Sequence, residues 1–354
     1  MRWLFSETAI SYQLSALSYQ LTASRSPRSL IPDAHFRILC AVPFSYSDFD
    51  LSGVATYPLA SRKSKAHASE FAKVYQPGSG VAGLVASLPT MLAGEDFRAV
   101  VGAVRAARAS NGGMLWGLGA HVIKTGLAPV LIDLMERGFV SAIAMNGAGI
   151  IHDFEVALSG ATSEEVEDAL GPGRFGMAEE TGTLLNAAIN QGVAAGKGIG
   201  QAVGERLLEL SPRHGALSLV AAAARLGVPV TVHVAIGTDI IHMHPAASGA
   251  ALGEGSLRDF RYFVSNVARL RGGVYLNCGS AVVLPEVFLK AVALVRNRGI
   301  SLDGLTTVNL DFMRLYRPLT NVVSRPTAGI GKGYSLVGHH EIMIPLLAAA
   351  LIEP

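Results

Sequence analysis

The chain reads MLWGLGAH at residues 114–121 and SAIAMNGAG at residues 141–149. Each stretch is a short apolar run that ends in glycine or asparagine, as a buried strand followed by a turn does. Similar runs recur at residues 230–236, 274–277 and 305–310. Helical patterns lie between them, and such alternation is typical of βαβ units. We therefore predict an α/β fold, a Rossmann-like open, largely parallel sheet with helices on both faces.

The helices expected between these strands follow an apolar period of 3.6 residues. They span residues 81–107, 127–137, 163–170, 178–191, 200–210, 217–226, 257–270, 285–298 and 341–352. The tetrapeptide Thr162-Ser163-Glu164-Glu165 places a hydroxyl before two acids, a pattern typical of helix starts. Ligands of open parallel sheets bind beyond the carboxyl ends of the strands. The residues directly after each strand are therefore the candidates for function.

The composition is that of a globular chain. Half of the 354 residues are hydrophobic and 16% are charged, which excludes disorder over most of the chain. The net charge is +2 and no basic run could follow a phosphate backbone, so no nucleic-acid partner is expected. Uncharged stretches fall short of the roughly 18 apolar residues of a membrane span. Two cysteines, Cys40 and Cys278, form no disulfide framework and favour a reducing cytoplasm.

The first 45 residues differ from the rest. The motif Ser-Tyr-Gln-Leu occurs at residues 11–14 and again at 18–21, and a polar run follows. This near-duplication carries no apolar face and no clean cleavage site for a secretory signal. We expect residues 1–45 to be a low-complexity N-terminal extension and residues 46–354 to form the α/β domain.

Two strand ends carry glycine-rich turns. Gly117 and Gly119, after the first strand, would let the backbone approach a phosphate, although the third glycine of the dinucleotide fingerprint is missing. The second strand runs into His152, Asp153 and Glu155. One interpretation is a loop in which Asp153 caps the following helix. A second, more specific interpretation is that His152 and Glu155 contact a ligand. Both interpretations can be true at once.

The later strand ends carry further polar residues. Asp239 directly follows the third strand and suits a ligand hydroxyl or amine, whereas His242 and His244, two residues apart, form a candidate metal pair. Ser280 precedes a helix and serves equally well as an N-cap or as part of an anion site. Lys332 lies between glycines in an expected loop, where it is either a solvated lysine, the more common case, or part of a loop that folds over a site.

The ordered set of these motifs resembles the deoxyhypusine synthase superfamily, specifically its bacterial deoxyhypusine-synthase-like branch. The resemblance runs from about residue 54 to residue 353. The motifs that carry it are Thr56-Tyr57-Pro58-Leu59, Gly119-Ala120-His121-Val122-Ile123-Lys124, Asn146-Gly147-Ala148-Gly149 with His152-Asp153-Phe154-Glu155, Gly237-Thr238-Asp239, Gly279-Ser280-Ala281-Val282 and Gly338-His339-His340-Glu341.

The resemblance implies NAD as cofactor, a homotetramer, and transfer of an aminobutyl group from spermidine through an enzyme lysine to an amine or protein-lysine acceptor. It carries over Thr238, Asp239 and Gly279 as NAD or polyamine contacts. With Asn146 and Gly147 of the matching motif, and with the turn glycines and Ser280 argued above, they make up the predicted cofactor site. The catalytic lysine of the family is replaced by Arg325 when counted from Arg317-Pro318. Arginine stays protonated and cannot form the imine, so Lys332 is the nearby substitute.

Our leading hypothesis is an NAD-dependent, deoxyhypusine-synthase-like transferase acting on a polyamine. Asp239 and Glu155 would hold ammonium groups, and Lys332 or a histidine such as His152 would handle the imine or the proton. Two alternatives stay open. One is a metal-dependent hydrolase of an amine or guanidine substrate, and the other is a catalytically silent binder of NAD or polyamine. The hydrolase would draw on His152, Asp153, His242, His244 and His339 or His340.

Overall fold

The computed structural model describes residues 46–353, so the expected extension at residues 1–45 lies outside the described residues. The described residues belong to two units, 46–63 and 64–353. The first unit carries a 3-10 helix, η1 (Leu59–Ser61), and its side chains are exposed. The second unit carries the sheet and the candidate site.

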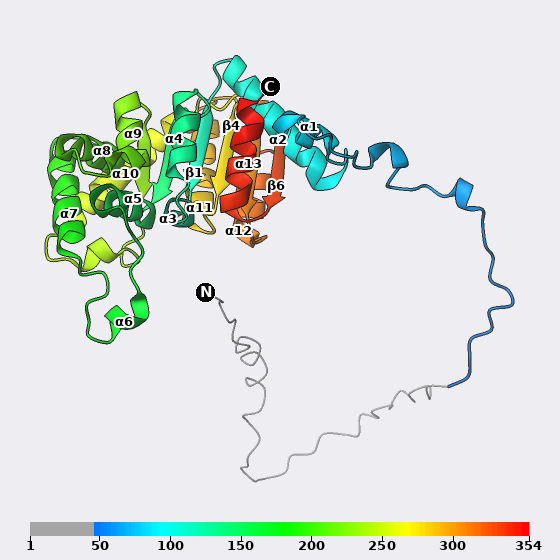
Figure 1. Cartoon of the computed structure of the whole chain (residues 1–354), viewed down its shortest axis with the longest axis horizontal. Helices are drawn as coiled ribbons and strands as arrows, with labels where there is room; N and C mark the ends of the chain where they lie inside the picture. Colours follow the sequence, from blue (N-terminus) through cyan, green and yellow to red (C-terminus); the bar gives the residue numbers. More distant parts are fainter. Residues whose placement is uncertain (1–45, 354) are drawn as a thin grey trace, which may run out of the picture. The chain divides into compact units, whose positions relative to one another are not determined.

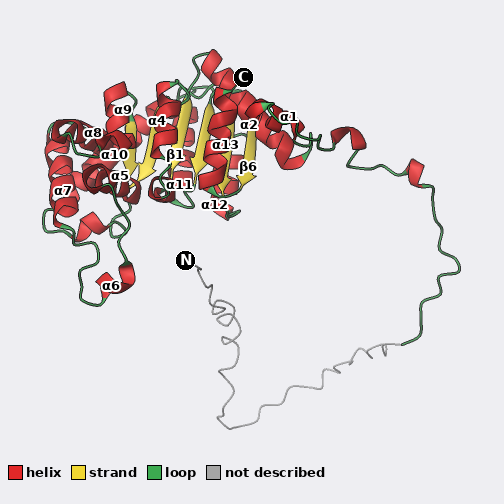
Figure 2. Cartoon of the chain, in the orientation of Figure 1, coloured by secondary structure: helices red, strands yellow, loops and turns green. Residues whose placement is uncertain are grey.

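The second unit is built on one six-stranded, all-parallel sheet in the order β3-β2-β1-β4-β5-β6 (Figures 1 and 2). The strands are β1 (Met114–Leu118), β2 (Ala142–Asn146), β3 (Val230–His233), β4 (Val274–Cys278), β5 (Thr306–Asp311) and β6 (Lys332–Val337). This confirms the predicted α/β, Rossmann-like open parallel sheet. Five strands coincide with predicted apolar runs, and the sixth was not predicted.

Helices fill the connections between the strands. The α-helices are α1 (Gly80–Ser87), α2 (Leu92–Ala109), α3 (Ala120–Lys124), α4 (Ala128–Glu136), α5 (Gly147–Ser159), α6 (Val166–Leu170), α7 (Glu179–Ala194), α8 (Ile199–Leu210), α9 (Leu219–Leu226), α10 (Gly249–Val267), α11 (Val283–Asn297), α12 (Tyr316–Pro318) and α13 (His340–Ile352). Shorter helical turns are η2 (Ala68–Glu70), η3 (Gly215–Leu217), η4 (Ile240–Met243) and the π-helical η5 (Leu319–Ser324). Within the described residues, no helix has both the length and the apolar character needed to cross a bilayer.

Two expectations about helices were wrong. The single helix expected at 81–107 is divided into α1 and α2, because Pro89 disfavours a helical conformation of Leu88 before it. The polar cluster after β2, expected as a loop, forms α5 instead. Its buried side chains Ile150, Ile151, Phe154 and Ala157 recur at helical spacing and pack in the core.

The two faces of the sheet bury different helices. Trp116 and Leu118 pack on the face covered by α2, α4 and α13, whereas Leu115 and Tyr275 pack on the face covered by α10 and α11. Figure 1 shows α4 and α13 in front of the strands. Burial on both faces explains why the strands read as continuous apolar runs, as is usual in parallel sheets.

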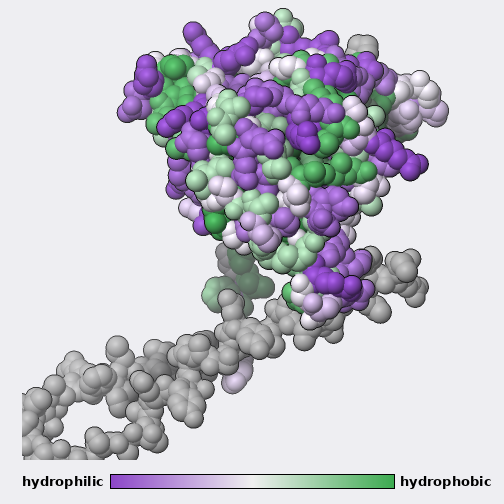
Figure 3. All heavy atoms as spheres, turned by 90° about the vertical axis from the view of Figure 1, so that its left-hand side faces the viewer, coloured by the Kyte–Doolittle hydropathy of each residue, from purple (hydrophilic) through white to green (hydrophobic). Residues whose placement is uncertain are grey.

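The β3 edge of the sheet is closed by side chains of α10. Asp259 accepts a hydrogen bond from the backbone N–H of Val232 (2.8 Å), and Ser256 accepts one from Val234 (3.2 Å). These bonds satisfy N–H groups that an edge strand would otherwise present to another chain. Figure 3 views the molecule from this side, where hydrophilic residues alternate with separate hydrophobic areas.

Candidate functional site

A pocket of about 420 Å³ lies at the carboxyl ends of β2 and β3. His152 and Glu155 of α5 line it, as do Thr238 and Asp239 of the turn after β3. The opposite wall comes from residues 163–178, a segment that leaves the body of the unit, carries α6 and returns to α7 (Figure 1), and Ala148, Ile151 and Ile240 complete the lining. The structure therefore brings together four residues that were predicted from separate parts of the sequence.

The N-terminus of α5 is occupied by the chain's own carboxylate. Asn146 caps this helix, because its side chain accepts a hydrogen bond from the N–H of Gly149 (3.0 Å). A Cβ added to Gly147 would lie 1.9 Å from Oδ2 of Asp239, so only glycine lets Asp239 approach so closely. A helix N-terminus attracts anions, and here Asp239 is that anion.

Asp239 combines burial with nearby donors. Burial raises the pKa of its carboxyl, and nearby His242, the Thr238 hydroxyl and the N–H of Ala148 oppose that rise. The residue is 7% exposed, so its charge is poorly hydrated from outside. A ligand that enters the pocket therefore meets a carboxylate with unmet hydrogen-bonding capacity.

Three side chains form a hydrogen-bonded relay on the α5 side of the pocket. The hydroxyl of Thr162 donates to Oε2 of Glu155 (2.5 Å), and Nδ1 of His152 lies 2.7 Å from the same hydroxyl. Because a hydroxyl has a single proton, His152 must donate from Nδ1, which leaves a lone pair on Nε2. Burial lowers the pKa of His152, Glu155 opposes this only in part, and the charge of Lys124 lowers the pKa further, so the ring is neutral near pH 7.

Three contributors to the pocket were missed at the sequence level. Thr181 of α7 donates a hydrogen bond to Oε1 of Glu155 (3.1 Å). Glu164 accepts a hydrogen bond from the N–H of Gly176 (2.8 Å), and this bond joins the two ends of the segment that carries α6. The third is Thr162. Thr162 and Glu164 belong to the tetrapeptide interpreted as a helix start, but α6 begins only at Val166. No local pattern marks Thr181.

Asp153 was expected in a loop, where it would cap the next helix. That placement was wrong, because Asp153 lies buried within α5. Its carboxylate accepts hydrogen bonds from the hydroxyl of Ser218 and from the N–H groups of Leu219 (2.7 Å) and Val220 (3.2 Å), at the start of α9. Burial raises the pKa of Asp153 to about 6, although the three hydrogen bonds favour the ionised carboxylate and oppose this rise. Asp153 is thus a cap, but for a helix distant in sequence.

The predicted cofactor residues Gly117, Gly119, Gly279 and Ser280 gather where the strand order reverses, between β1 and β4. This is where doubly wound sheets bind nucleotides. However, a Cβ on Gly117 would lie 2.5 Å from the Tyr275 hydroxyl, and one on Gly119 would lie 2.1 Å from the carbonyl oxygen of Gly279. The glycines thus allow protein groups to pack together.

The backbone N–H groups of Gly119 and Gly279 already donate hydrogen bonds within the protein. The N–H of Gly119 donates to the carbonyl of Cys278 (2.8 Å), and the N–H of Gly279 donates to the carbonyl of Leu310 (3.1 Å). The hydroxyl of Ser280 accepts from the N–H of Leu284 (3.2 Å), as a capping residue does. A dinucleotide phosphate needs open space and free N–H groups beside the glycines. The residues present therefore do not fit a phosphate at this turn.

Lys332 lies far from the other predicted catalytic residues. It begins β6 and pairs in register with Thr306, the first residue of β5. Its place is therefore at the amino end of the sheet, whereas the pocket is at the carboxyl ends. The expectation of a loop over the site was wrong, because residues 332–337 pair with β5 along their whole length.

The histidines considered for a metal site are dispersed. Nδ1 of His242 and Nδ1 of His244 each accept a backbone N–H, from Gly237 and Ala246 respectively, both at 3.1 Å. His340 bonds instead to the carbonyl of Leu310. In the part of the chain that the structure describes, no three histidine, cysteine or acidic side chains gather as metal ligands do.

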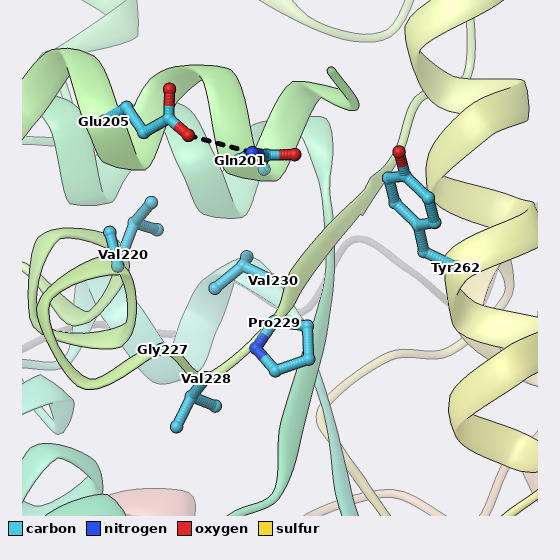
Figure 4. Close-up of a pocket in the computed structure, with 10 residues that line it drawn as sticks. Gln201, Glu205, Val220, Gly227, Val228, Pro229, Val230 and Tyr262 are labelled. Carbon is cyan, nitrogen blue, oxygen red and sulfur yellow. Dashed lines mark hydrogen bonds between the residues drawn. The ribbon is translucent and has the colours of Figure 1, made fainter. Parts of the chain in front are cut away.

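A second pocket, of about 380 Å³, lies at the amino end of β3 (Figure 4). Val220, Val228 and Pro229 form its apolar wall, and Gln201 donates a hydrogen bond to Glu205 at its rim. None of the predicted site residues lines it. Its position opposite to the carboxyl ends argues for the first pocket as the functional one.

No protein-family model and no curated protein matches the chain. Among solved structures, it resembles apo ArgZ, an arginine dihydrolase from the ornithine-ammonia cycle in cyanobacteria (17% identity, TM-score 0.46, 75% of this chain and 33% of that one). It also resembles AgrE in its ternary complex with ornithine and NAD+ (16%, 0.48, 73% and 32%). A third likeness is to a "putative deoxyhypusine synthase" from Entamoeba histolytica (12%, 0.46, 79% and 96%).

The chain spans about a third of the length of ArgZ and AgrE.

Proposed function

We propose that the pocket at the ends of β2 and β3 binds an organic amine as its cation and that the chain acts on that amine with His152 as the proton acceptor. One observation carries this proposal. Among the described residues, the lining holds three carboxylates, Glu155, Glu164 and Asp239, with one imidazole and no lysine or arginine. Such a lining attracts a cation and repels phosphates and carboxylates.

The carboxylates near the α6 segment suit an ammonium group. Glu155 is held by two hydroxyl donors, Thr162 and Thr181, and each of its oxygens has a further lone pair. Glu164 uses one oxygen for the N–H of Gly176. The remaining acceptors match the three donors of a primary ammonium group.

His152 supplies the acid–base group. Its Nδ1 is held by Thr162, so its Nε2 lone pair can accept a hydrogen bond from the bound ammonium and take the proton that the nitrogen gives up as it reacts. A neutral amine is the form that is oxidised or that attacks an electrophile. This step needs only residues that line the pocket or contact its lining.

The resemblance to deoxyhypusine synthases supports a specific form of this activity. It would be NAD-dependent transfer of an aminobutyl group from spermidine to an amine or protein-lysine acceptor, by a homotetramer. NAD would take up the hydride in that reaction. The packed glycines between β1 and β4 do not fit its phosphates, and Lys332 lies at the other end of the sheet. We therefore derive no step through NAD or through an enzyme lysine.

Isothermal titration calorimetry with spermidine and 1,4-diaminobutane tests the amine proposal. We expect saturable binding that weakens with salt and that falls at least about tenfold in Glu155→Gln or Glu164→Gln, since each removes one charge from the pocket. Glu209→Gln, on the exposed side of α8, is the matched control. Absence of binding by any amine, or equal loss in the control, would overturn the proposal.

A separate titration tests the cofactor. Thermal unfolding is compared with and without NAD, because a ligand at about a thousand times its Kd adds roughly 4 kcal/mol to the stability. A shift with NAD, followed by release of diaminopropane from spermidine, would support aminobutyl transfer. No shift, together with amine binding, would favour chemistry without NAD.

A further inference from the structure

The segment between α5 and α7, residues 161–178, is attached to the body of the unit near both of its ends. At the first end, the hydroxyl of Thr162 donates a hydrogen bond to Glu155 of α5. At the second end, Gly176 packs so closely against the body that a Cβ added to it would lie 2.8 Å from the side chain of Ile240. Glu155 and Ile240 both line the pocket, so the segment is anchored at the pocket itself.

The part of the segment between these anchors is bonded to itself. Among the described residues, the hydrogen bonds of residues 165–175 all stay within the segment, as when the N–H groups of Arg174 and Phe175 donate to the carbonyl of Ala169 (2.9 and 3.1 Å). Ala169 is the one buried residue of α6. Figure 1 shows α6 standing apart from the other helices. A part with so few buried contacts moves at a lower cost in free energy than the core does.

Two features of the segment favour its movement toward the pocket. Val166, which lines the pocket, and Leu170 are 43% and 63% exposed, so a closer approach of α6 would remove apolar surface from water. Ser163, at the base of the segment, has a φ of 69°, a left-handed conformation that residues other than glycine rarely adopt. The present path of the backbone is therefore strained there, and a change of path relieves that strain.

The acceptors proposed for the ammonium group are divided between the body and the segment. Glu155 belongs to α5, whereas Glu164 belongs to the segment and uses one oxygen for the N–H of Gly176 (2.8 Å). Both carboxylates line the pocket. An ammonium group that bonds to both joins the segment to the body, so it binds more tightly when the segment is closed than when it is open. A ligand shifts a conformational equilibrium by this difference in affinity.

We propose that residues 161–178 form a lid that an amine ligand closes over the pocket. The ammonium group holds Glu164 of the lid to Glu155 of the body, and Val166 covers the alkyl part of the ligand. The closed lid keeps water away from Nε2 of His152 while the proton moves. The proposal rests on the proposed function, since it takes the same pocket to bind an amine. It adds the movement that binding produces.

Limited digestion with trypsin tests the lid, because Arg174 is exposed on it and is the only lysine or arginine between Arg137 and Lys197. We expect saturating 1,4-diaminobutane to slow cleavage after Arg174 at least about tenfold, since cleavage follows the population of the open form. Cleavage at the exposed residues 62–65 should keep its rate, which controls for inhibition of trypsin by the amine.

Two variants and a second measurement complete the test. At an amine concentration that saturates each variant, Glu164→Gln should lose the protection, whereas Glu167→Gln, which removes a charge from α6 outside the pocket lining, should keep it. In the unaltered protein, amide hydrogen exchange of residues 165–175 should slow at least about tenfold with the amine, and that of α10 should not change. Amine binding by calorimetry without protection in either measurement, or equal protection in Glu164→Gln, overturns the lid and leaves the amine site intact. Absence of binding overturns both proposals.

Discussion

The carboxylate of Asp153, in the middle of α5, accepts a hydrogen bond of 2.7 Å from the backbone N–H of Leu219, 66 residues further along the chain. Leu219 is the first residue of α9, so the bond satisfies an N–H group that the start of a helix leaves open. Asp153 is flanked on α5 by His152 and followed two residues later by Glu155. The helix that carries these pocket residues is thus fastened to α9 by a buried cap.

Replacement of Asp153 with Asn should destabilise the fold. The amide turns a donor or a weaker acceptor toward Ser218, Leu219 and Val220, and we expect a loss of roughly 2–4 kcal/mol. The midpoint of urea unfolding measures it. Asp168→Asn, at an exposed position of α6, should stay within about 0.5 kcal/mol of the parent protein. Similar midpoints for both variants would contradict the capping role.

Asp259 predicts a dependence of stability on pH. Burial raises its pKa to about 7, although the N–H groups of Gly200, Val232 and Ile199 and the charge of Arg258 oppose the rise. The folded state therefore binds this proton more tightly than the unfolded state. The resulting stability is present in full below about pH 4 and is lost as pH rises through about 7.

Asp259→Asn isolates this effect. The amide oxygen can still accept from Gly200 and Val232, as the carboxylate does at 3.0 and 2.8 Å, but it does not titrate. Relative to the parent protein, the variant should gain stability between pH 5 and pH 8, by an amount of the order of a few kcal/mol. A difference in the free energy of unfolding between the variant and the parent protein that stays constant from pH 5 to pH 8 would contradict the raised pKa.

Gly147→Ala should disturb the pocket because the new methyl group would lie 1.9 Å from Oδ2 of Asp239. We expect a loss of roughly 1–3 kcal/mol from this overpacking, and weaker amine binding. Gly253→Ala is the matched control, since Gly253 lies within α10 with open space beside it. That change should stabilise the protein by roughly 0.5–1 kcal/mol. Equal shifts in melting temperature would refute the close contact.

The main architecture was predictable because the buried strands are continuous apolar runs. β6 was missed for a physical reason: at the sheet edge its residues are mostly part-exposed, so Lys332–Val337 shows no such run. α5 was missed because the polar cluster of His152, Asp153 and Glu155 is typical of a loop after a strand. The apolar spacing from Ile150 onward carried the helical signal.

Residues of the site could be predicted only where polar or ionisable side chains directly follow a strand. His152, Glu155 and Asp239 were named for that reason, and they meet because β2 and β3 are neighbours. Local sequence patterns do not reveal the order of the strands in the sheet, so the proximity of these three residues could not be predicted. Thr181 of α7 donates a hydrogen bond to Glu155 of the pocket lining, and no local sequence pattern marks this role. Long-range contacts of this kind require the fold.

Lys332→Ala should leave amine binding unchanged within about twofold, because the residue lies at the amino end of the sheet. The same calorimetric titration that reveals the loss in Glu155→Gln measures it. A tenfold loss in Lys332→Ala would place this lysine in the site and would revive the imine hypothesis.

Thr162→Val tests the relay that positions His152. Valine keeps the shape of threonine but removes the hydroxyl that donates to Glu155 and faces Nδ1 of His152. Without it, the imidazole loses the partner that fixes its proton on Nδ1, and proton transfer should slow at least about tenfold. Thr162→Ser keeps the hydroxyl and should restore the rate.

The state of His152 can be measured directly, without a known substrate. In ¹⁵N-histidine-labelled protein, the parent should show a protonated Nδ1 and an unprotonated Nε2 near pH 7, whereas Thr162→Val should show a mixture of tautomers. Thr125→Val, which removes a hydroxyl bonded to the carbonyl of His121, should leave these resonances in place. Since a merely structural role of Thr162 would alter stability without changing the tautomer, unchanged resonances in Thr162→Val would exclude the relay.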